Sequence, residues 1–193
     1  MATPKQLVSA VATALYVPEA TVTVHDRNLS VAGLRSVGGR GRAAAKVTTK
    51  DAANLLIATA ASRNVKDSVQ AIFQYGSLVS THRWTSRFNP PELAVLTSSH
   101  TLAEAVTALI HSAVTGTFTQ SGTRESLREL FVTFYGPIPE CEIKVLRLQG
   151  RDSLQRYVHP RAAPTGSPVG FGLRYSTYFT HRTIIEVAKI FSL

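Results

Sequence analysis

Apolar residues near the start of the chain recur with the period of an α-helix. Residues 4–15 place four of them on one helical stripe: Leu7, Val8, Val11 and Leu15. Thr3 stands before this stripe as a capping residue, and Pro4 suits the first turn because its missing N–H needs no partner there. The pattern predicts a first helix with one buried face.

A second helix is predicted over residues 18–32. It begins at Pro18 and turns three apolar residues inward at helical spacing: Val22, Leu29 and Ala32. It should end at Gly33, because glycine readily adopts the left-handed conformation found at helix C-termini. The same periodicity places four other residues on polar faces: Thr21, Thr23, His25 and Arg27.

A glycine-rich loop separates this helix from a third one. Glycines at positions 38, 39 and 41 favour a loop over residues 34–47. Thr48 or Thr49 can cap a helix that runs to about Arg63. Its apolar face consists of Ala52, Leu55, Leu56, Thr59 and Ala60. The first third of the chain is therefore predicted as helix, corner, helix, loop and helix.

The remaining two thirds mix helical and strand patterns. Helical spacing of apolar residues predicts helices over 67–83, 101–114 and 183–191. Residues 127–135 are dense in apolar and aromatic side chains. Alternation of side chains predicts strands over 142–148 and 172–179. We expect a mainly α chain with a small β component, an α+β fold in which these two strands form a short antiparallel pair.

Positive charge is concentrated in the first third of the chain. The net charge is +9 and the isoelectric point is about 10.1, so the protein should attract polyanions. Residues 1–66 contain nine Lys or Arg against three Asp or Glu, whereas residues 67–193 contain twelve against nine. Between positions 27 and 50 there are six basic residues and no acidic one: Arg27, Arg35, Arg40, Arg42, Lys46 and Lys50.

Such a run of charge usually forms a solvated surface, and that is the alternative to a binding role. Here the basic residues flank a glycine loop between two helices, where backbone amides and guanidinium groups can both reach phosphates. The loop also follows a helix whose polar side carries Thr, His and Arg. These two features favour nucleic acid as the partner.

Known catalytic and metal-binding motifs are missing from the sequence. There is no H-E-x-x-H, no paired C-x-x-C, no G-x-S-x-G, and the glycines at 38–41 lack the Lys-Ser/Thr pair of a phosphate loop. The six histidines are scattered, and Cys141 lies between two glutamates, which do not favour a thiolate. We expect no enzymatic activity, no cofactor and no metal.

The sequence favours a soluble cytoplasmic protein without a membrane partner. A single cysteine excludes an intramolecular disulfide and suits a reducing compartment. No apolar run reaches the roughly 18 residues of a membrane span, and the N-terminus lacks the pattern of a signal peptide.

The order of residues over 17–56 resembles the winged helix-turn-helix of the mercury-resistance-regulator (MerR) superfamily. The residues that carry the resemblance are Val17, Thr21-Val22, Asp26-Arg27, Leu29, Gly33-Leu34, Arg40-Gly41-Arg42 and Thr48 to Ala53 with Leu55-Leu56. Related domains occur in phage excisionases and in some phage small terminase subunits. The resemblance implies a DNA-binding domain over residues 1–66, followed by a mostly helical oligomerisation or partner-binding domain over 67–193.

With this resemblance, residues 18–32 would enter the major groove of DNA. Four side chains would face base edges and nearby phosphates: Thr21, Thr23, His25 and Arg27. Four others would clamp the flanking backbone: Arg35, Arg40, Arg42 and Lys46. We expect residues 1–66 to fold and bind DNA weakly on their own.

The expected function is that of a bacterial or phage transcription regulator that binds double-stranded DNA. A lone helix-turn-helix reads few bases, so a dimer is expected. The C-terminal two thirds of the chain, which end in the apolar segment 183–191, would supply its interface unless these residues fill the core of their own domain. A phage small terminase subunit is the first alternative. The second is a structural phage protein whose basic face binds an acidic partner.

Overall fold

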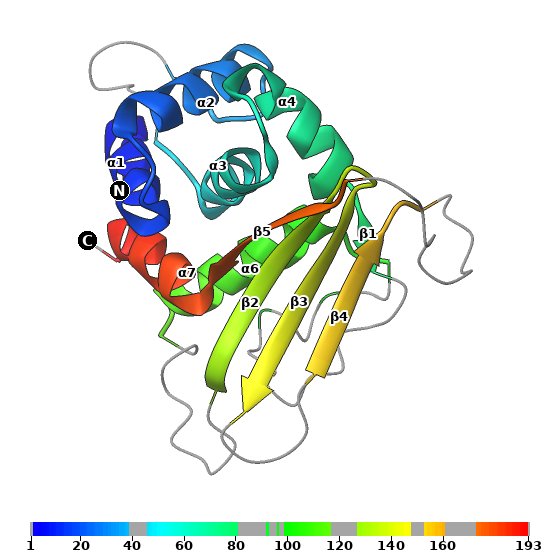
Figure 1. Ribbon diagram of the computed structural model, residues 1–193. Helices are drawn as coiled ribbons and strands as arrows, with labels where there is room; N and C mark the ends of the chain where they lie inside the picture. The colour runs from blue at the N-terminus through cyan, green and yellow to red at the C-terminus, as the bar shows by residue number, and fades with distance from the viewer. Residues whose placement is uncertain are drawn as a thin grey trace.

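Helices and an antiparallel sheet form a mixed α+β fold, as the sequence predicts (Figure 1). The computed structural model describes residues 2–38, 46–80, 92, 96, 99–116, 127–147, 153–160 and 173–192. The helices are α1 (Pro4–Leu15), α2 (Glu19–Val31), α3 (Thr49–Ala61), α4 (Ser68–Ala71), α6 (Leu102–Val114) and α7 (His181–Ala188). The other helical segments are the 3-10 helices η2 (Val65–Asp67) and η4 (Lys189–Phe191) and the π-helix η3 (Ile72–Gly76).

The predicted helix starts and the predicted stop at Gly33 are confirmed. Thr3 caps α1 and Thr48 caps α3, each by accepting a hydrogen bond from a backbone N–H of the first turn. Gly33 follows α2 with a φ of 71°, in the left-handed region that glycine tolerates.

None of the described helices is long and apolar enough to cross a membrane.

The sheet is larger than the predicted strand pair. It contains β1 (Val79–Ser80), β2 (Leu127–Gly136), β3 (Glu140–Arg147), β4 (Ser153–Val158) and β5 (Tyr175–Thr180), in the order β1-β4-β3-β2-β5. Both predicted strands exist as β3 and β5, but the prediction that they pair is wrong, because β2 lies between them. The strand β2 has aromatic residues on both faces, so side-chain alternation did not reveal it.

The predicted helix over 67–83 is also shorter than expected. Helical structure stops at Gly76, and the chain then enters β1, which pairs with β4 and makes an isolated bridge to Thr101. Residues 81–83 lie outside the described residues. The predicted helices over 101–114 and 183–191 are confirmed as α6 and as α7 with η4.

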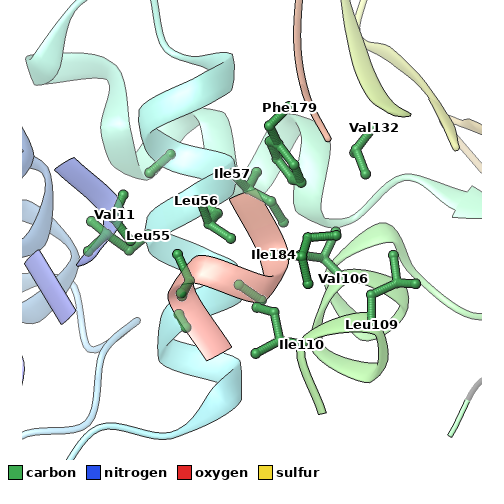
Figure 2. Close-up of a cluster of buried hydrophobic side chains, with 14 of the residues drawn as sticks. Val11, Leu55, Leu56, Ile57, Val106, Leu109, Ile110, Val132, Phe179 and Ile184 are labelled. Carbon is green, nitrogen blue, oxygen red and sulfur yellow. The ribbon is translucent and has the colours of Figure 1, made fainter. Parts of the chain in front are cut away.

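The helix α3 lies at the centre of the molecule, surrounded by the other helices and β5 (Figure 1). Nine of its 13 residues are buried. Figure 2 shows one cluster of apolar side chains drawn from α1, α3, α6, α7, β2 and β5. The hydrophobic core is therefore continuous across residue 66, where the sequence suggested a domain boundary.

Candidate nucleic-acid interface

The outer side of α2 carries two of the predicted base-reading residues. Thr23 and Arg27 are exposed, and Thr21 is half-buried. The Thr23 hydroxyl donates its hydrogen to the carbonyl oxygen of Glu19 at 2.8 Å. Toward a ligand it can therefore act only as a hydrogen-bond acceptor. Arg27 retains its full set of donors, because no described residue forms an ion pair with it.

His25 is a correction to the sequence prediction, which placed it on a polar face of the same helix. Its side chain is buried, with 3% of the residue exposed, and its Nδ1 atom lies 2.8 Å from the Oγ atom of Ser68. Burial lowers the pKa of His25 below its ordinary value. The imidazole therefore belongs to the interior contact between α2 and α4 and cannot face a base edge in this structure.

Arg35 is likewise engaged within the protein. Its Nε atom lies 2.8 Å from Oδ1 of Asp26, in an ion pair without the alignment of a hydrogen bond, and both side chains are nearly buried. Its Nη1 donates to the carbonyl oxygen of Ser36 at 2.8 Å. Burial raises the pKa of Asp26, and the Arg35 charge opposes this shift. The predicted phosphate clamp at Arg35 would have to compete with Asp26.

Asp51 holds both ends of the glycine-rich loop. Its Oδ1 accepts the backbone N–H of Ser36 at 2.7 Å, near the start of the loop, and its Oδ2 accepts the backbone N–H of Thr48 at 2.7 Å, just after it. The Thr48 hydroxyl also donates to Oδ2, at 2.9 Å, within the capping box of α3. Asn54 adds a third anchor by donating to the carbonyl oxygen of Leu34 at 2.7 Å.

These anchors hold Leu34, Ser36 and Thr48, the described residues on either side of the glycines, against the first turns of α3. Lys46 and Lys50 follow the loop and are exposed. Arg40 and Arg42, the other predicted backbone contacts, lie outside the described residues. The structure therefore places exposed lysines just before α3 and in its first turn, at positions 46 and 50, and an exposed arginine on α2 at position 27.

Because acidic residues are buried, the ratio of basic to acidic side chains is higher at the surface of the first third than in its sequence. Among the described residues up to position 66, six basic side chains are exposed: Lys5, Arg27, Lys46, Lys50, Arg63 and Lys66. Glu19 is the exposed acid of the same set, because Asp26 and Asp51 are both buried. A surface of this composition attracts phosphate groups.

The apolar side of the C-terminal helix packs inside the molecule. Ile184, Val187 and Ala188 are buried in the core of their own chain, and α7 packs against α1 and α6. For this helix, the structure agrees with the alternative that the C-terminal residues fill the core of their own chain. Cys141 is also buried, and burial raises the pKa of its thiol well above the ordinary value.

The structural roles of Asp51 and Asp26 differ in whether the local sequence could have predicted them. Asp51 stands three residues after Thr48, which is the spacing of a capping box, so local sequence could have identified it. The pairing of Asp26 with Arg35 carries no such signal.

The segment that resembles a winged helix-turn-helix keeps the predicted order of two helices, a loop and a third helix. Its described residues contain no β-strand, and residues 39–45 of the loop are outside them. The chain matches no protein-family model, no curated protein and no solved structure with which it was compared.

Proposed function

We propose that this protein binds double-stranded DNA without catalysing a reaction, through the basic surface of its N-terminal helices. The observation that carries the proposal is the imbalance of exposed charge: six basic side chains against one acidic side chain among the described residues up to position 66. Each phosphate contact made by such a side chain releases about one counterion, which favours binding at low salt.

The contacts divide into two groups. Lys46 and Lys50, with Arg40 and Arg42 of the loop between the anchors, hold the phosphate backbone. Arg27 and Thr23 on the outer side of α2 contact base edges. His25 and Arg35 have supporting roles, since one fixes α2 against α4 and the other fixes the start of the loop against α2.

The proposed biological role is transcription regulation by a dimer, because one helix reads too few bases for high specificity. Light scattering of the protein, alone and on a duplex of about 30 base pairs, tests this role. A dimer on the duplex supports the regulator. A closed ring of many subunits contradicts it and indicates a small terminase subunit instead.

Salt dependence of duplex binding tests the DNA proposal directly. If about four phosphates are neutralised, a plot of log K against log salt has a slope of about −3.6. Lys46→Ala and Lys50→Ala should each reduce this slope by about 0.9. Lys144→Ala is the matched control, since Lys144 is an exposed lysine on β3. A flat salt response, or an equal effect of Lys144→Ala, contradicts the proposal.

Base reading by α2 has a separate test. On a preferred site selected from random duplexes, Arg27→Ala and Thr23→Ala should each weaken binding by about 1 to 3 kcal/mol, and by much less on random DNA. Equal losses on both duplexes indicate a protein that coats DNA without reading it. Tighter binding to an acidic polypeptide than to any duplex supports an acidic protein partner.

A further inference from the structure

A polar pocket lies at the C-terminal end of α3, the opposite end from the basic loop. Its volume is about 490 Å³, within the range of small-molecule sites. The end of α3, the segment from η2 to η3 and the start of β5 form its walls. Ala61, Ala71 and Tyr75 contribute buried apolar or aromatic surface to its lining.

The strand β5 and the end of α3 bring a charged group to this pocket. The Thr177 hydroxyl donates to the carbonyl oxygen of Ala60 at 2.7 Å, which ties the strand to the helix. Tyr175 lies two residues earlier on the strand. The guanidinium of Arg63 stacks on its ring in a cation–π contact, with the Arg63 Cζ atom 4.9 Å from the ring centroid. An arginine stacked in this way has lost part of its side-chain freedom, and its N–H edges remain available for two oxygens of a phosphate group.

The glycine at position 136 makes room for the Tyr175 ring. Gly136 pairs with Tyr175 across β2 and β5. A Cβ atom at this position would lie 2.1 Å from Cζ of Tyr175 and 2.3 Å from its hydroxyl oxygen. Any side chain at 136 would therefore displace the ring, and with it the surface on which Arg63 rests.

Hydrogen-bonding groups complete the pocket. Gln70 and Gln74 are exposed, line the pocket one helical turn apart, and each offers both a donor and an acceptor. Asp67 also lines it and accepts a hydrogen bond from the Asn64 amide at 3.2 Å. The Oγ atom of Ser62, another lining residue, is buried without a hydrogen-bond partner among the described residues.

We infer that this pocket binds a nucleotide, with Arg63 on its phosphate. The amides of Gln70 and Gln74 match the donor and acceptor edge of a base, as glutamine does with adenine. The Asp67 carboxylate accepts hydrogen bonds from sugar hydroxyls, and the apolar part of the lining suits the flat face of the base. The nucleotide is either a free mononucleotide or one residue of a single strand. None of the residues proposed above to contact the duplex lines this pocket.

Calorimetric titration of the full-length protein with adenosine monophosphate, adenosine and inorganic phosphate tests the inference. The monophosphate should bind at least tenfold more tightly than either of the other two probes, because it alone engages both parts of the pocket. Arg63→Gln should lower its affinity at least tenfold and leave that of adenosine within twofold. Lys66→Ala is the matched control, since Lys66 is exposed and near in sequence but does not line the pocket, and it should change the affinity less than twofold.

Gly136→Ala tests the role of the stacked ring, because the added methyl group displaces Tyr175 while every residue that lines the pocket keeps its chemical identity. It should lower the affinity for the monophosphate about fivefold or more while the protein remains folded by circular dichroism. No binding of the monophosphate, or equal effects of Arg63→Gln and Lys66→Ala, overturns the inference. If Gly136→Ala prevents folding, the comparison of Arg63→Gln with Lys66→Ala decides alone.

Competition with a short single strand identifies the source of the nucleotide. A 5′-phosphorylated trinucleotide that displaces the monophosphate at lower concentration indicates a strand, and weaker displacement indicates a free mononucleotide. Lys46→Ala and Lys50→Ala separate this site from the proposed duplex surface. They should leave the affinity for the monophosphate within twofold, and a larger loss would mean that binding is nonspecific attraction by charge, which overturns the inference.

Discussion

His25 donates its Nδ1–H to the hydroxyl oxygen of Ser68, 2.8 Å away, and thereby joins α2 to α4. The direction follows from the neighbours of Ser68. The Ser68 hydroxyl gives its own hydrogen to the carbonyl of Val65, so its oxygen can only accept from the imidazole. Asn28 donates to the same oxygen at 3.3 Å and to the Val65 carbonyl at 2.8 Å. Of the two neutral tautomers of His25, only the one with its proton on Nδ1 can make this contact.

This contact predicts a loss of stability in mild acid. Burial lowers the pKa of His25 in the folded protein, so below about pH 6.5 the unfolded chain binds a proton that the folded protein does not. The stability that the neutral, buried His25 contributes is fully present above about pH 6.5. It is lost as the pH falls below this value, at up to about 1.4 kcal/mol per pH unit. Denaturant unfolding between pH 7.5 and 5 measures it.

His25→Asn is the matched variant for this measurement. Its side-chain amide can donate to Ser68 from nearly the same position but does not titrate in this range. The other histidines are unchanged, so the variant should lose less stability than the wild type as the pH falls. Parallel curves for the two proteins would show that His25 does not titrate differently in the folded and unfolded states.

The ion pair between Asp26 and Arg35 predicts a cost that depends on which partner is removed. Arg35→Met should lower the free energy of unfolding by about 3 kcal/mol at pH 7, because it leaves a nearly buried carboxylate without its cation. This cost should shrink as the pH falls, since the carboxylate becomes protonated and its burial is no longer penalised. Urea unfolding at pH 7 and pH 5 measures both effects.

The double variant Asp26→Asn with Arg35→Met provides the control for this pair. It removes both charges, so it should be more stable at pH 7 than Arg35→Met alone. If Arg35→Met costs nothing, the pair contributes no stability and Arg35 is free to act elsewhere.

Asp51→Ala should loosen the basic loop as well as α3. It removes the acceptor for the backbone N–H groups of Ser36 and Thr48, and we expect a loss of about 2 kcal/mol in the free energy of unfolding. Amide exchange of Ser36 should accelerate in the same variant, as measured by NMR.

Glu104→Ala is the matched control for Asp51→Ala. Glu104 is exposed and occupies the same capping-box position in α6, where Thr101 is the one described residue that donates to its carboxylate. It should cost about 0.5 kcal/mol and leave Ser36 exchange unchanged. Equal costs for the two variants would contradict an anchoring role for Asp51.

A fragment of residues 1–66 should not fold alone, contrary to the expectation from charge distribution. The helix α3 packs against α6, and α1 packs against α7, so excision would expose buried apolar side chains such as Leu56 and Ile57. Circular dichroism of the fragment should show much less helix than the intact chain does over the same residues. A fragment with a cooperative thermal transition would restore the idea of two independent domains.

Local sequence was sufficient to predict most of the helices. The signals of Thr3, Thr48 and Gly33 act within a few residues of the helix end that they stabilise, so a short window contains all of their chemistry. The concentration of positive charge in the first third is likewise visible without a structure. The larger excess of basic over acidic side chains at the surface is not visible in the sequence, because it depends on the burial of Asp26 and Asp51.

Contacts between distant segments set the order of the strands, the burial of His25 and the pocket at Arg63. The partner of His25 is 43 residues away, and Tyr175 lies still farther along the chain from Arg63. Helical periodicity shows that a position faces one side of its own helix, but it carries no information about which remote element covers that side. A polar residue at such a position therefore looks exposed until the fold supplies its hydrogen-bond partner and removes it from water.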